Sequence, residues 1–253
     1  MKNIKSIILF LPALLLTSCG ARQIITPDAK KIMQDINANR QGAYDRSFDY
    51  SFDYHQEENN SGVSDAVYKY KMNYENNDTY YYQKGEMSTS KNSDDYYELY
   101  KVKNDKYEEV IYLNYQIDGT KDTVAFTKKD HGDDYYEIPA QFQLAMFVGV
   151  AFYQEILTQF TNPENVISGY ESIVKYYSEN GKHLKCVVDY DEKDEDTGGR
   201  NKAHIVVEYK DYLLSSYENK ISTPSGNSFA KVKMAYDNVN IELPNNWENY
   251  IKA

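Results

Sequence analysis

The stretch Phe48-Asp49-Tyr50-Ser51-Phe52-Asp53-Tyr54 decides the fold class, because aromatic and polar residues alternate in it without a break. Alternation with a period of two puts every aromatic ring on one face of an extended chain and every polar side chain on the other. This segment is therefore predicted to be a β-strand with one buried and one solvated face. The same phase returns in a second strand through Ala66, Tyr68, Tyr70, Met72 and Tyr74.

Strand-like segments continue on both sides of these two, separated by turn formers such as Asp118-Gly119. Sequential strands with short polar turns predict an antiparallel meander. In the last strand the buried phase moves from even residues before Asp237-Asn238 to odd residues after it, which predicts a bulge or sharp bend there. The further strands are expected near residues 79–87, 95–103, 106–115, 122–128, 134–138, 184–190, 203–209, 212–222 and 230–243.

Two helices are expected. Thr26-Pro27-Asp28 is typical of a helix start, and Ala29, Ile32, Met33 and Ile36 then share one face as far as about Gln41-Gly42. Residues 142–160 are too long for a strand and apolar nearly all round, which predicts a central helix buried in the domain. Its unbroken apolar stretch is about half of the ~20 residues that a membrane-spanning helix needs. The fold class is therefore α+β, with the central helix packed on an antiparallel sheet.

The N-terminus carries Lys2 and Lys5, then an apolar run, and then Leu16-Thr17-Ser18-Cys19. A basic start followed by a short apolar core is typical of a secretory signal. The last four residues resemble the lipobox of bacterial lipoproteins, which implies cleavage before Cys19 and a lipid on its thiol. We accordingly expect a signal peptide at 1–18, a lipidated tether at 19–27 and one domain at 28–253. The domain would sit in the cell envelope, on the extracytoplasmic side of a membrane.

Charge and composition exclude some classes of partner. The 253 residues carry a formal net charge of −11, and loss of Lys2 and Lys5 with the signal brings it to −13. Phosphate backbones repel such a chain, so nucleic-acid binding is not expected. The 27 tyrosines leave two readings open. They suit half-buried strands, where the ring packs and the hydroxyl stays wet, but they could also form a platform for a glycan or a protein.

Signals for catalysis, cofactors and metals are sparse. The four histidines show no metal-ligand spacing, and the acidic stretch from Asp189 to Gly199 does not fit a calcium loop, so a solvated hairpin loop is favoured there. His183 and His204 are placed on the outward phase of two pairing strands, and if Tyr190 faces Ala203 then His204 faces Asp189. Cys186 lies in phase with apolar neighbours and is expected to be a buried thiol. We expect no enzyme, no cofactor and no metal site.

The order of elements, together with Val239-Asn240-Ile241-Glu242-Leu243-Pro244 closing the last strand, is similar to that of the LolA/LppX-like lipoprotein carriers. This resemblance implies a curved, unclosed half-barrel whose helices lie on the concave face and enclose an apolar cavity for acyl chains. The leading hypothesis is a noncatalytic surface lipoprotein that binds an apolar or amphipathic ligand. The alternative is an interaction module with a solid core and exposed tyrosines, and the ligand and any protein partner stay open. The residues that the resemblance places at the cavity are Phe142, Met146, Phe147, Val150, Phe152 and Ile156.

Overall fold

In the computed structural model of the chain, the described residues are 21–39, 46–59, 62–73, 80–89, 92–102, 110–117, 119–127 and 158–251. Cys19, the strand expected at 134–138 and the six predicted cavity residues lie outside these ranges. The described strands are β1 (Arg22–Ile24), β2 (Phe48–Glu58), β3 (Gly62–Asn73), β4 (Tyr80–Thr89), β5 (Asn92–Val102), β6 (Val110–Ile117), β7 (Thr120–Thr127), β8 (Lys175–Ser178), β9 (Leu184–Lys193), β10 (Arg200–Lys210), β11 (Leu213–Thr223) and β12 (Gly226–Tyr236). The helices are α1 (Thr26–Asn39), α4 (Pro163–Ile167) and the 3-10 turn η4 (Trp247–Tyr250).

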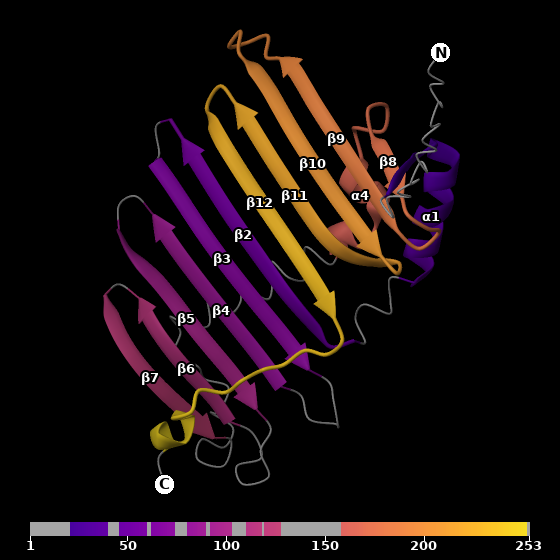
Figure 1. The fold of residues 1–253 in the computed structure, drawn as a ribbon. Coiled ribbons are helices and arrows are strands. Elements are labelled where there is room, and N and C mark those ends of the chain that lie inside the picture. The colour runs from indigo at the N-terminus through magenta and orange to yellow at the C-terminus, as the bar shows by residue number, and fades with distance from the viewer. Residues whose placement is uncertain are drawn as a thin grey trace, which may run out of the picture.

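All twelve strands belong to one antiparallel sheet, which is curved and open (Figure 1). Their order is β1-β8-β9-β10-β11-β12-β2-β3-β4-β5-β6-β7. The sheet is thus two meanders, one from β8 to β12 and one from β2 to β7, which meet where β12 pairs with β2. The predicted meander and its antiparallel pairing are confirmed. β1 and β8 were not predicted, and the pairing of Ile24 with Tyr176 joins them at the edge opposite β7.

The two faces of the sheet differ as the alternation predicts. Phe48, Tyr50 and Phe52 of β2 lie opposite Met72, Tyr70 and Tyr68 of β3, so the aromatic rows of the two strands share one face. The rings of Phe48 and Tyr70 stack with their centroids 5.2 Å apart. We call this the core face, and the side that carries Asp49, Ser51 and Asp53 the opposite face.

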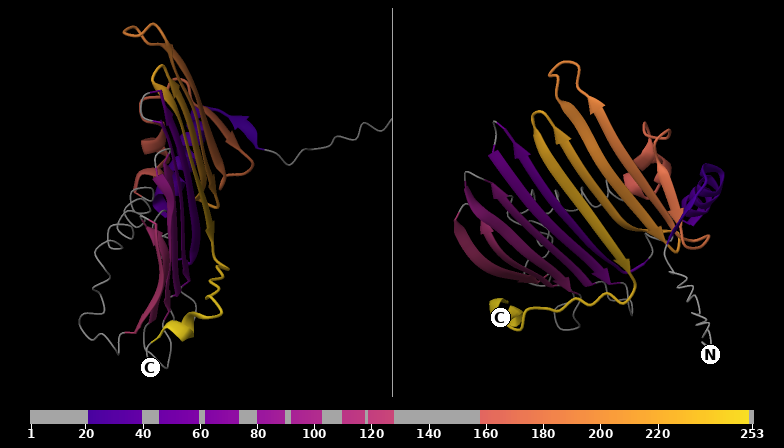
Figure 2. Two further views of the ribbon diagram at one scale, coloured as in Figure 1. Left: turned by 90° about the vertical axis from the view of Figure 1, so that its left-hand side faces the viewer. Right: turned by 45° about the horizontal axis from the view of Figure 1, so that its top comes forward.

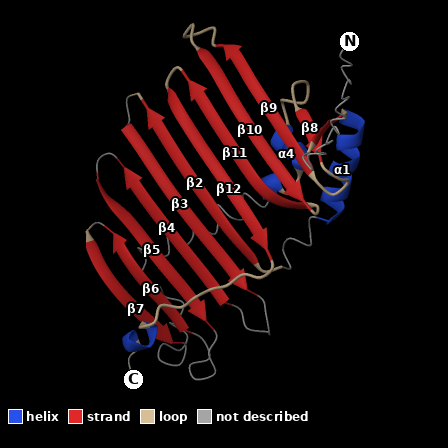
Figure 3. Cartoon of the chain, viewed as in Figure 1, coloured by secondary structure: helices blue, strands red, loops and turns tan. Residues whose placement is uncertain are grey.

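α1 begins and packs as predicted and runs to Asn39, whereas its predicted end near Gln41-Gly42 lies outside the described residues. The four apolar residues of its predicted face are all buried, and they join the core cluster of the sheet beside β8, β9 and α4. Figure 3 shows the helices grouped at the β8 side of the sheet, with η4 at the other end. Residues 22–27, predicted as part of a tether, already belong to the fold, because β1 and the first turn of α1 occupy them.

The predicted bend after β12 is confirmed, but the strand predicted beyond it is not formed. Asp237 and Asn238 both have left-handed backbone angles, with φ of 63° and 49°. Their bend sends residues 239–246 away from the β-ladder and across the opposite face to η4 (Figure 2). There Trp247 packs with Tyr100, Tyr112 and other buried residues of β5–β7. The odd-numbered apolar residues that looked like a strand are instead the buried side of an irregular strap.

Candidate ligand-binding face of the sheet

The core face carries apolar clusters on several neighbouring strands. On β2 and β3 it is built by aromatic side chains from both strands, and it continues across β5 and β6. In the antiparallel register Leu99 lies opposite Leu113, and Tyr97 lies opposite Tyr115. A single face of aromatic and branched residues on neighbouring strands is what cross-strand packing favours. The buried residues of this face on β2, β3, β5 and β6 are Phe48, Tyr50, Phe52, Tyr68, Tyr70, Tyr97, Leu99, Ile111, Leu113 and Tyr115.

The described helices cover only one end of this face. α1 contacts mainly β8, β9 and α4. Phe160, just before α4, packs against Tyr217 of β11 with ring centroids 4.2 Å apart, and its carbonyl accepts a hydrogen bond from the hydroxyl of Tyr209. The cluster around Leu99 and Leu113 lies several strands away from these contacts, on β5 and β6. The central helix was predicted for residues beyond the described ranges, so its place over this cluster stays a prediction.

Phenol groups give the core face a sparse polar component. Burial raises the pKa values of Tyr50 and Tyr68 above their ordinary value, and it raises the pKa of Tyr217 to about 12. These hydroxyls are therefore neutral at physiological pH and can donate or accept a hydrogen bond without charge. A surface that mixes rings, aliphatic groups and neutral hydroxyls suits an apolar or amphipathic molecule better than an ionic one.

The tyrosine platform required by the alternative hypothesis is not found among the residues whose side-chain exposure the structure describes, which do not include Tyr80, Tyr81 and Tyr82 of β4. It needs a cluster of exposed tyrosines on the opposite face, away from the helices. Tyr100 and Tyr112 do lie on the opposite face, but both are buried beneath Trp247. The exposed large hydrophobic residues of the described part are Ile25, Ile173, Ile221 and Tyr250, so tyrosine is represented there once. This distribution favours the reading in which tyrosine serves half-buried strands.

The opposite face carries a polar groove beneath the C-terminal strap. Its floor comes from β2 and β3, and its volume is about 680 Å³. Lys71 and Asp49 form an ion pair of 3.2 Å inside it. Asn73 holds the strap above the groove by donating its amide to the carbonyl of Val239. The side chains of the groove are of both charges, and they are Asp49, Ser51, Lys69, Lys71, Tyr100, Asn240, Ile241 and Glu242.

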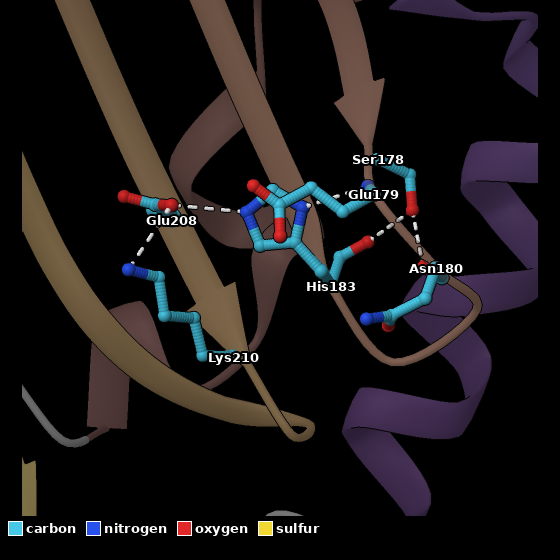
Figure 4. Close-up of polar contacts among 6 residues, drawn as sticks. All are labelled: Ser178, Glu179, Asn180, His183, Glu208 and Lys210. Carbon is cyan, nitrogen blue, oxygen red and sulfur yellow. Dashed lines mark hydrogen bonds and ion pairs between the residues drawn. The ribbon is translucent and has the colours of Figure 1, made fainter. Parts of the chain in front are cut away.

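His183 is a buried structural residue, although its sequence phase predicted an outward position. It lies just before β9, in the turn after β8, and it is nearly inaccessible to solvent (Figure 4). Its Nδ1 accepts the backbone N–H of Glu179 at 3.2 Å, so its Nε2 carries the proton and donates to Glu208 Oε1 at 2.9 Å. Both ring nitrogens are thus occupied in tying the β8–β9 turn to β10. No sequence signal identified Glu208 as the partner.

Charges around Glu208 compensate for its partial burial. Burial alone would raise its pKa, but the hydrogen bond with His183 and the charge of Lys210 outweigh this effect and hold the pKa below its ordinary value. Lys210 Nζ lies 3.6 Å from Glu208 Oε1. The carboxylate is therefore ionised and fully engaged, which is the environment of a structural ion pair rather than of a general acid.

The other candidate reactive groups are also held in structural contacts. His204 lies opposite Asp189 as predicted, with Nδ1 2.7 Å from Oδ1. The loop within the acidic stretch is shorter than expected, because β9 runs to Lys193 and β10 starts at Arg200. Asp194 closes that loop by accepting the backbone N–H groups of Asp196 and Thr197. Within the described ranges, no three His, Cys, Asp or Glu side chains gather closely enough to hold a metal ion.

Cys186 is buried as predicted, on the core face between Leu184 and Val188. Burial raises the pKa of its thiol to about 12, so the thiolate that nucleophilic chemistry needs is absent at neutral pH. In the part of the chain that the structure describes, no helix is long and apolar enough to cross a membrane.

Comparisons with known proteins give remote likenesses only. No protein-family model matches the chain, and no curated protein matches it. Among solved structures, LprF from Mycobacterium bovis matches at a TM-score of 0.29 and 13% identity, over 87% of this chain and 97% of that one. A beta-barrel-like protein of domain of unknown function DUF1849 from Brucella abortus matches at 0.22 and 7%, over 76% and 98%. A DUF1329 family protein from Desulfovibrio piger matches at 0.24 and 9%, over 87% and 96%.

Proposed function

We propose that this protein is a noncatalytic lipoprotein of the cell envelope, anchored through lipid on Cys19, which holds an apolar or amphipathic molecule against the core face of its sheet. The observation that carries the proposal is the width of that face. Its apolar rows extend over β2, β3, β5 and β6, whereas α1 makes its main contacts at β8 and β9. The buried side chains of these rows are at most 9% exposed, so the bound acyl chain or ring system lies against them inside the covered part of the domain.

The noncatalytic part of the proposal has independent support in the described residues. The buried histidine and the buried thiol are both fixed in structural roles, the first by two hydrogen bonds and the second by apolar packing. Neither is paired with a nucleophile or a base in the way that covalent catalysis needs. The structural roles of these two residues support the binding function that we propose.

Ala66 and Val67 provide a matched test of the ligand site. They are consecutive residues of β3, both half-buried, and they lie on opposite faces of the sheet, with Ala66 on the core face. The unlipidated chain 19–253 carrying Cys19→Ser would be stripped of lipid and titrated with a fluorescent long-chain fatty acid. Ala66→Trp fills space on the core face and should weaken binding at least about tenfold, whereas Val67→Trp should leave it unchanged.

Two further measurements separate binding from folding and anchoring. Native mass spectrometry of the unlipidated chain, expressed with lipid present, should show a co-purified apolar ligand, and circular dichroism should confirm that both variants are folded. A chain that stays ligand-free, together with equal fatty-acid affinities of the two variants, would refute the binding function. The anchor is tested separately, by the intact mass of the protein extracted from membranes of its own source.

A further inference from the structure

The start of the fold lies very close to the lipidated cysteine. Only Gly20 and Ala21 separate Cys19 from Arg22, the first residue of β1. A fully extended chain advances at most ~3.6 Å per residue, so the Cα atoms of Cys19 and Arg22 can be at most about 11 Å apart. β1 is also the terminal strand of the sheet. A lipid on Cys19 therefore brings this edge of the sheet, rather than a distant tether, to the membrane surface.

Exposed apolar side chains gather at the same edge. Ile25, which follows β1, is 66% exposed, and Ile173, which precedes β8, is 39% exposed. The antiparallel pairing of Ile24 with Tyr176 places the end of β1 beside the beginning of β8, so these two isoleucines lie at the same end of the β1–β8 pair. They are two of the four exposed large hydrophobic residues in the described part of the chain. In water, neither exposure is favourable.

The charge of the segment that holds β1 and α1 differs in sign from that of the whole chain. Residues 21–39 carry Arg22, Lys30 and Lys31 against Asp28 and Asp35, a net charge of +1 in a chain of −11. All three basic side chains are exposed. α1 lies along the β8 side of the sheet (Figure 1), where β1 pairs with β8. Basic side chains beside an exposed apolar residue are suited to the boundary between phosphate headgroups and acyl chains.

We propose that the edge formed by β1, β8 and α1 docks on the bilayer, a proposal that rests on the lipid anchor at Cys19. Ile25 and Ile173 enter the interfacial layer, while Arg22, Lys30 and Lys31 meet lipid phosphates. In this orientation, each successive strand from β1 towards β7 lies farther from the membrane. At a spacing of ~4.8 Å, twelve strands place β7 about 50 Å along the sheet from β1. The acidic remainder of the domain is thereby kept away from the headgroups.

Tryptophan fluorescence can test this orientation, because Trp247 is the only tryptophan of the chain and lies beside β7. Residues 19–253 would be coupled through the Cys19 thiol to a maleimide phospholipid in phosphatidylcholine–phosphatidylglycerol vesicles that contain a spin-labelled lipid. Cys186 is buried and should not compete in the coupling. Ile25→Trp, in a Trp247→Phe background, reports on the docking edge. Ile221→Trp in the same background is the matched control, because Ile221 is a 36% exposed isoleucine of β11.

The indole introduced at position 25 should lose about half of its emission to the spin label, since side chains of interfacial segments penetrate the headgroup region by ~5–10 Å. The indole at position 221 and native Trp247 should keep theirs. Equal quenching at all three positions, or none at position 25, would overturn the proposed orientation even for a protein that is lipidated. Conversely, an intact mass without lipid in the native membrane fraction would overturn the anchor, and with it the docking of the edge in the cell.

Discussion

Replacing His183 by alanine should destabilise the fold far more than the same change at His204. Both histidines contact a carboxylate, at 2.9 Å from Glu208 and 2.7 Å from Asp189, but their side-chain exposures are 5% and 44%. His183→Ala removes a hydrogen bond to a charged group and leaves the Glu179 N–H without its acceptor. Together these losses should cost about 3 kcal/mol of unfolding free energy. His204→Ala breaks only an exposed pair, which is expected to cost about 0–1 kcal/mol.

Urea unfolding at pH 7, followed by circular dichroism, measures both differences under identical conditions. The comparison is internally controlled because both sites have a histidine beside a carboxylate and receive the same substitution. The reasoning would be refuted by equal losses at the two positions, since burial is then not the factor that makes the pair important. A large loss at both sites would also contradict it.

The same pair makes a prediction for acidic pH. The pKa of Glu208 is held below its ordinary value of 4.5 in the folded state, so the unfolded chain binds a proton at a higher pH than the folded chain does. The contribution of the ionised carboxylate is therefore fully present above that value and is lost as the pH falls through the folded pKa. The stability difference between the wild-type chain and Glu208→Gln should shrink over this acidic range. A difference that stays constant from pH 7 down to pH 3 would contradict the assignment.

Three further experiments, one labelling reaction and two substitutions, test the packing. Cys186, with a pKa raised to about 12, should resist maleimide in the folded protein and react promptly in urea, as followed by mass spectrometry. Tyr209→Phe removes the bond from the hydroxyl to the Phe160 carbonyl and should cost about 1–2 kcal/mol in urea unfolding, whereas no change would mean that this bond is replaced by solvent. Trp247→Ala should cost about 3 kcal/mol and make the C-terminal strap sensitive to protease, and an unchanged digestion pattern would show that the strap is held by other contacts.

The parts of the fold that could be predicted are those in which side-chain phase carries the information. The alternation from Phe48 to Tyr54 is sufficient to define β2 and its two faces, because each aromatic residue must share the core face with its partners on β3. The same logic placed His204 opposite Asp189, since a register shift of one residue would have moved every apolar residue of β9 to the wrong face. The bend at Asp237-Asn238 followed from the phase change alone.

The parts that could not be predicted are short strands, irregular segments and turns, in which the local sequence pattern does not determine the structure. β1 and β8 are three and four residues long, and they pair across some 150 residues of chain, so neither shows a pattern of its own. Residues 239–243 alternate as a strand does, yet they form an irregular strap, and their apolar side chains make up its buried side. The buried position of His183 is determined by the turn before β9 and not by the alternation of residues along β9. The pairing of His183 with Glu208 depends on how that turn folds over β10, which no local pattern encodes.

The meeting of the two meanders at β2 and β12 has a consequence for how the chain reaches its native state. Most neighbouring strands are consecutive in sequence and can pair as hairpins, but Phe48 pairs with Tyr236, nearly the whole length of the domain away. Such long-range closure is slow, because the entropy of a large loop must be lost before the contact forms. The pairing in the middle of the sheet can form only after β12, the last strand, has been synthesised. A chain with this strand order therefore keeps an unpaired edge on β2 for as long as it is being synthesised.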